Sequence, residues 1–244
     1  VHRFDDRIAD ESYAAVLRRR KATRALLERA QPIDAKRLQG ADRVSHGLFV
    51  EQLRNDVASE VCEFALWSLS PRSNPVTQWN QLPEDHEVDT AKRGEALLAR
   101  YRAIPGAIDQ EIENLRLGAK RGLYANAHSA RLVVEMVDKQ LAQPLADWPL
   151  LAPTKAERAS WGAAARRRFD EQLRSVVDTK IRPALRRYLD TLETEIVPKA
   201  RGADAEGIGA LPGGKACYTA LIRSHTTRAL TPQQVHHNGL REEH

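Results

Sequence analysis

Apolar residues recur every three or four positions along most of the chain, as they do in helices that bury one face. Stretches in which apolar and polar residues alternate are too short to predict a sheet. The sequence therefore predicts an all-α fold, an irregular multi-helix array with a Gly/Pro-rich loop near the C-terminus. Helices are expected over residues 11–30, from 42 to a proline-rich stretch at 71–75, 91–104, 107–118, 132–141 and 160–197.

Prolines divide this pattern, because proline lacks the backbone N–H that a helix interior needs. Pro105, followed by glycine, predicts a break between two helices, and Pro183 predicts a kink in the longest run. The polar residues 76–90 are expected to form a long loop. Thr90, Ser160 and Thr231 stand where a side chain could cap the first turn of the helix that follows.

The only glycine-rich stretch, "RGADAEGIGALPGG" at 201–214, divides the chain into a helical region, 1–200, and a C-terminal region, 201–244. It matches neither the P-loop nor the GxGxxG dinucleotide fingerprint. A short helix follows, and a strong helix start at Thr231, Pro232 and Gln234 comes after it. His236 and His237 lie in that last helix without partners at the usual ligand spacing. They are therefore expected to be packing or surface residues rather than metal ligands.

The composition is typical of a globular protein, with 42% hydrophobic and 29% charged residues in a chain of 244. The net charge of +5 is spread over 38 basic and 33 acidic residues, which does not favour nucleic-acid binding. No stretch approaches the roughly 20 apolar residues of a membrane span. Cys62 and Cys217 lie far apart, and their spacing decides neither whether they pair nor which redox compartment holds the protein.

Complete catalytic motifs are missing from the sequence. His86 and Glu87 begin an HExxH pattern, but Thr90 stands where the second histidine is required. The G-x-S-x-G motif of serine hydrolases is also absent. We therefore predict no catalytic residue and no metal ligand in this chain.

The tail "LPGGKACYTALIRSHTTRALTPQQVHHNGLRE" resembles a segment of the bacterial domain-of-unknown-function family 885. Members show a Pro-Gly-Gly turn, a tyrosine, "HTT", "LTP" and an "IH.LGL.E" helix. Looser similarity extends through residues 2–12 and 101–141. The matching residues of the tail are Pro212, Gly213, Gly214, Tyr218, His225, Thr226, Thr227, Leu230, Thr231, Pro232, Val235, His236, Gly239 and Leu240.

The resemblance implies a mostly helical zinc metallopeptidase about twice as long as this chain. Its presumed zinc site is a His-Glu-x-x-Pro-Gly-His motif that lies C-terminal of the "LTP" helix, and no residue of this chain matches that motif. Zinc is therefore expected in the full-length parent, and the C-terminal half of the same protein is the expected partner. The chain is expected to be cut at both ends, and relatives lean to secreted, periplasmic or lipid-anchored locations.

Within such a parent, the tail is expected to help form one wall of a peptide-binding cleft, inactive by itself. Gly213 and Gly214 could offer backbone donors there, and Tyr218 and His225 could contact an extended peptide. The alternative is a stand-alone helical interaction module for an acidic partner. The two interpretations differ in one observable property, because a severed half should expose an apolar patch.

Overall fold

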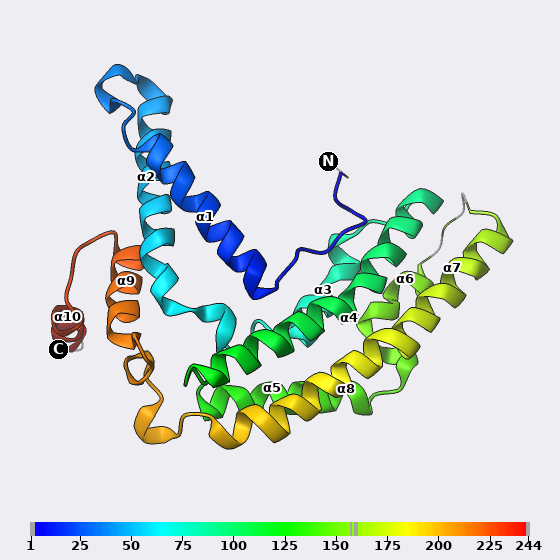
Figure 1. Ribbon diagram of the computed structural model, residues 1–244. Coiled ribbons are helices and arrows are strands. Elements are labelled where there is room, and N and C mark those ends of the chain that lie inside the picture. The colour runs from blue at the N-terminus through cyan, green and yellow to red at the C-terminus, as the bar shows by residue number, and fades with distance from the viewer. Residues whose placement is uncertain (1–2, 157, 159–160, 243–244) are drawn as a thin grey trace. The chain divides into compact units, whose positions relative to one another are not determined.

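The computed structural model describes residues 3–156, 158 and 161–242, and Figure 1 shows its helices in chain order. Over these residues the fold is all-α as predicted, without a named strand. Contacts divide the described chain into two compact units. Unit 1 combines the N-terminal stretch to Ser12 with residues 66–204, and unit 2 combines residues 13–65 with 205–244.

Unit 1 is organised around α4 (Ala91–Lys120), which lies against the long helical run of α7 (Ala163–Val176) and α8 (Arg182–Thr191). Contacts advance together along both segments, from Arg102–Gln172 to Arg116–Glu195, so the two run parallel (Figure 1). The remaining helices of the unit are α3 (Pro75–Asp85), α5 (Ala127–Ala142) and the short α6 (Ala152–Lys155). Their apolar faces meet in one cluster that includes Trp148, Tyr101 and Tyr188, all nearly inaccessible to solvent.

The predicted break at Pro105 is wrong, because α4 continues through it without interruption. A proline inside a helix costs about 3 kcal/mol through a lost hydrogen bond and a steric clash. Here the residues on either side, Tyr101, Ile104 and Ile108, are almost completely buried in the core. Burial of one such side chain contributes about 1.5–3 kcal/mol, so the apolar face outweighs the local preference. The helix ends at Lys120, and Gly122 follows with a φ of 71°, in the left-handed region that commonly ends helices.

The predicted loop over 76–90 is also wrong, since most of it forms α3. Asn74 caps this helix by accepting from the backbone N–H groups of Val76 and Thr77, and the Thr77 hydroxyl pairs with the backbone of Asn74 in return. Pro75 occupies the first helical position, where its missing N–H costs nothing. Trp79 and Leu82 then bury one face of the helix in unit 1.

The longest predicted run is helical but not uniformly α. Residues Val177–Ile181 and Leu192–Ile196 form two π-helical segments, the first directly before Pro183, where a kink was expected, and the second after α8. Such segments shift the side chains that follow them around the helix axis and often occur at functional sites. Ser160, the predicted cap of this run, lies outside the described residues.

Unit 2 consists of α1 (Tyr13–Ala30) and α2 (Gly40–Ser59) with α9 (Gly214–Thr226) and α10 (Pro232–Glu242). Leu27 and Ala30 of α1 pack on Val50 and Leu53 of α2, a core of very few side chains. Two shorter segments belong to the same unit: η2 (Glu60–Cys62), directly after α2, and η10 (Ile208–Ala210), before α9. The predicted start of the last helix is confirmed: the Thr231 hydroxyl accepts from Gln234 N, and Gln234 Oε1 accepts from Thr231 N.

Candidate functional site

The Pro-Gly-Gly turn of the predicted site lies in unit 2, immediately before α9. Gly213 has a φ of 73°, in the left-handed region that glycine adopts without strain. Gly214 donates its N–H to Leu211 O at 2.8 Å, and a Cβ at Gly214 would lie 1.8 Å from Ile208 O. The chain conformation thus requires both glycines. It also occupies the Gly214 N–H, which is one of the two backbone donors that the sequence suggests for a peptide.

Tyr218 and His225 lie seven residues apart on α9, which places them on the same helix face about 10 Å apart along the axis. Both side chains are exposed, Tyr218 by 40%. The structure therefore places these two predicted residues on one face of α9, two turns apart. His236 and His237 are exposed on α10, in agreement with a surface position.

The opposite face of α9 lines an apolar pocket of about 590 Å³, which the segment before α10 closes from one side. None of the four predicted site residues lines this pocket. Alanine, leucine and proline side chains dominate its wall, with Arg223 as the charged group. The lining residues are Ala216, Thr219, Ala220, Arg223, Ala229, Leu230, Thr231 and Pro232.

A disulfide fixes α9 on the end of α2. Cys62 in η2 and Cys217 in the first turn of α9 are bonded, with their Cα atoms 4.8 Å apart. An ion pair between Arg223 Nη2 and Glu51 Oε1, at 2.8 Å, joins the same two helices farther along. The sequence left the pairing of the cysteines open, and the fold resolves it by bringing together two segments that are 155 residues apart.

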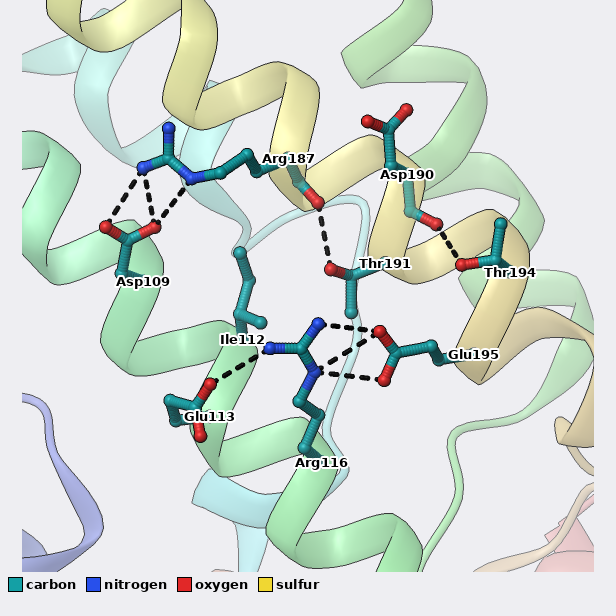
Figure 2. A pocket seen from close by; sticks show the side chains of 9 residues that line it. All are labelled: Asp109, Ile112, Glu113, Arg116, Arg187, Asp190, Thr191, Thr194 and Glu195. Atoms are coloured by element: carbon teal, nitrogen blue, oxygen red, sulfur yellow. Dashed lines mark hydrogen bonds and ion pairs between the residues drawn. The ribbon is translucent and has the colours of Figure 1, made fainter.

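A polar pocket of about 410 Å³ lies between α4 and the run formed by α8 and the second π segment, within unit 1. Figure 2 shows its side chains, with the residues of α4 facing those of α8 and the second π segment. Carboxylates and arginines dominate it, with three apolar or hydroxyl side chains between them. The lining residues are Asp109, Ile112, Glu113, Arg116, Arg187, Asp190, Thr191, Thr194 and Glu195.

Ion pairs connect the two walls of this pocket (Figure 2). Arg187 donates to both oxygens of Asp109, at 2.7 and 3.0 Å, and Arg116 donates to both oxygens of Glu195, at 2.6 and 2.9 Å. The hydrogen bond from Arg116 holds the pKa of Glu195 below its usual value. Arg116 also reaches Glu113 at 3.0 Å. Both arginines thus already have carboxylate partners, so the geometry favours a link between helices over an anion-binding site.

The spacing of charged and hydroxyl residues, rather than that of apolar residues, indicates this pocket in the sequence. Asp109, Glu113 and Arg116 recur at helical spacing, and so do Arg187, Thr191 and Thr194. The side chains that meet from the two helices were not predictable, because their pairing depends on the parallel packing of distant segments. The π segment after α8 contributes as well, since Glu195 lies within it.

Two further groups have shifted pKa values because they are buried. His86 in unit 1 is 4% exposed, and its ring nitrogens contact Arg93 O at 3.2 Å and Arg100 Nη1 at 3.3 Å. Burial lowers its pKa. Burial also raises the pKa of Glu111 to about 7, although its carboxylate accepts a 2.6 Å hydrogen bond from Tyr188.

Within the described residues, no three His, Cys, Asp or Glu side chains converge on a point where they could hold a metal ion. The described residues therefore do not provide a set of side chains that fits a catalytic zinc. In the same part of the chain, no helix combines the length and the apolar character needed to cross a bilayer.

Comparison with known proteins gives the family. The family model described as "Bacterial protein of unknown function (DUF885)" matches residues 1–244. The chain belongs to the DUF885 family. No curated protein matches it.

Among solved structures, a "putative lipoprotein" from Colwellia psychrerythraea superposes with a TM-score of 0.80 at 16% sequence identity. The match covers 98% of this chain and 42% of that one. At this identity the likeness shows a shared fold, and the chain spans less than half of the similar protein.

Proposed function

We propose that this DUF885 chain is the N-terminal helical part of a zinc-dependent peptidase or related hydrolase. In this proposal it forms one wall of the substrate cleft and supplies no catalytic group. The zinc and the base that activates its water belong to the part of the longer protein that is not in this chain. Zinc would lower the pKa of a bound water and so supply the nucleophile. The family resemblance of the tail supports the reaction class, and the 42% coverage of the similar structure supports a longer parent.

The observation that carries the proposal is the apolar surface that unit 2 leaves open. Val44 and Leu48 of α2 are 62% and 68% exposed, and Phe49 is 47% exposed. Val44 and Leu48 lie on the same face of α2 as Glu51, which forms an ion pair with Arg223 of α9. Ten of the described large apolar side chains of unit 2 are exposed, whereas Phe4 is the single such residue described in unit 1.

Val44 and Leu48 are neighbours one turn apart on α2, and exposed apolar side chains that gather on one face often mark a binding surface. The C-terminal part of the same protein is the partner that we propose for it. Tyr218 and His225 share the open face of α9, and in this proposal they contact an extended peptide at the edge of the same interface. The likeness to the "putative lipoprotein" of Colwellia psychrerythraea supports a location at or beyond the cell envelope.

The test uses the protein as its own host produces it, purified through an affinity tag and assayed with a quenched-fluorescence peptide library. Zinc content and peptide hydrolysis are measured for wild type and for Tyr218→Phe, His225→Ala and the control His237→Ala. We expect about one zinc per protein, and KM raised at least threefold in the first two variants with kcat and zinc content unchanged. The control should match wild type.

Two results would contradict the proposal. If the protein contains no zinc and shows no chelator-sensitive hydrolysis, it is not a zinc-dependent peptidase. If Tyr218→Phe and His225→Ala both keep the wild-type KM in an active enzyme, these side chains do not contact the substrate and the proposed cleft wall is wrong. Melting temperatures of the variants, measured in parallel, distinguish a lost contact from a lost fold.

A further inference from the structure

Unit 2 is formed by two pieces of chain that lie far apart in the sequence. Residues 13–65 provide α1, α2 and η2, and residues 205–244 provide η10, α9 and α10, with all of residues 66–204 between them. An assembly of this kind must close a long loop before its contacts form, which costs chain entropy. What joins the two pieces therefore decides whether unit 2 exists as a unit.

Apolar packing alone joins them weakly. The cluster formed by Ala30, Val50 and Leu53 lies entirely within the first piece. In the second piece, Leu211 and Ile222 are the buried apolar residues described besides Cys217, and α10 buries none. Unit 1, by contrast, has one continuous core that extends over α3, α4, α5, α7 and α8.

The ion pair between Arg223 and Glu51 is a polar contact that joins the two pieces, and it is partly exposed to solvent. The Arg223–Glu51 pair leaves 43% of the arginine side chain and 28% of the glutamate side chain accessible to solvent. Exposed pairs of this kind contribute little to stability, because water and salt screen them.

The Cys62–Cys217 disulfide is a covalent link between the pieces, and both cysteines are almost completely buried. The two cysteines are 3% and 2% exposed. Cys62 ends η2, and Cys217 lies three residues after Gly214, so the bond also fixes the Pro-Gly-Gly turn. Gly213 faces Val61, the neighbour of Cys62, across this contact.

From these contacts we infer that Cys62–Cys217 is the clamp that assembles unit 2, and that the protein reaches this fold in an oxidising compartment. Forming the bond removes two protons and two electrons from the two thiols. A disulfide-donating oxidant of the compartment takes up the electrons and is itself reduced to a dithiol. Such bonds persist outside the reducing cytosol, in the periplasm or beyond the cell. The inference stands on unit 2 alone and does not depend on the proposed peptidase activity.

The first test counts thiols in the protein that its own host makes, after acid quenching and labelling with a maleimide in denaturant. We expect the peptides that contain Cys62 and Cys217 to carry no label before reduction and one label each after it. Labelling of both cysteines without reductant would contradict the oxidising location.

The second test compares hydrogen exchange of the oxidised protein with that of the same protein reduced by a phosphine. Amides of α9 should exchange at least tenfold faster after reduction, while amides of α4 should be unchanged. Cys62→Ala/Cys217→Ala should match the reduced protein, and Glu51→Gln, which loses the ion pair alone, should change exchange less than threefold. Equal protection of α9 in the oxidised and reduced wild type would overturn the clamp, and this comparison does not depend on either variant folding.

Discussion

Glu111 makes the stability of unit 1 depend on pH. Its carboxylate accepts from the Tyr188 hydroxyl, and Tyr188 is inaccessible to solvent. Burial raises the pKa of Glu111 to about 7, from an ordinary value of 4.5. The unfolded chain therefore releases this proton at a lower pH than the folded chain does. Stability from this group is complete below pH 4.5 and falls as the pH rises to about 7.

The size of the effect follows from the separation of the two pKa values. A shift of one unit corresponds to 1.36 kcal/mol, so the full change is about 3 kcal/mol, of which about 2.5 kcal/mol falls between pH 5 and 8. Glu111→Gln keeps an acceptor for the Tyr188 hydroxyl but cannot ionise. Relative to wild type, the variant should therefore gain about 2.5 kcal/mol between pH 5 and pH 8.

Urea unfolding followed by tryptophan fluorescence measures this difference. The four tryptophans, at positions 67, 79, 148 and 161, all belong to unit 1, so the signal reports that unit alone. Tyr188→Phe provides a second variant, because the tyrosine hydrogen bond lowers the pKa of Glu111 and its loss should steepen the pH dependence. If wild type and Glu111→Gln change in parallel from pH 5 to 8, the carboxylate is solvated in the folded state and the reasoning is refuted.

Two further predictions concern α4 and use the same unfolding assay. Gly118→Ala should destabilise unit 1 by about 3 kcal/mol, because the new Cβ would lie 1.8 Å from the backbone oxygen of Leu66. Gly106→Ala, in the same helix with open space around it, should instead stabilise by about 0.5–1 kcal/mol, and equal effects would contradict the packing. Arg116→Ala breaks the ion pair to Glu195 across the polar pocket, and because that pair is exposed it should cost less than about 1 kcal/mol. A decrease of more than about 2 kcal/mol in the free energy of unfolding would contradict this, and would show that the two helices depend on the ion pair for their packing.

The helices of this chain follow from apolar spacing where packing and local preference agree. The capping residues Thr90 and Thr231 begin helices as predicted, because a cap depends only on residues within one turn. The predictions for Pro105 and for the stretch 76–90 were wrong because they used local signals alone. There the burial of Tyr101 and Trp79 against distant parts of the chain outweighs a local signal for a break or a loop.

Less of the candidate site than of the fold could be predicted from the sequence. The tail motif pointed to Tyr218 and His225, and their seven-residue spacing correctly implies one helix face. The disulfide between Cys62 and Cys217 and the ion pairs of the polar pocket join segments tens of residues apart or more. No periodicity in a single sequence encodes which distant faces meet. The requirement for Gly214 likewise comes from the carbonyl of Ile208, which only the folded turn brings near.

In the proposed function this chain is the non-catalytic helical part of a longer hydrolase. The most direct test is the intact mass of the protein from its own host, isolated with an antibody against unit 1 and measured by mass spectrometry. The account predicts a mass about twice the 27.4 kDa of this chain or somewhat more, with a zinc-binding sequence in the additional part. A mass of 27.4 kDa would contradict it, and would leave a stand-alone helical module whose apolar surface on unit 2 serves another protein.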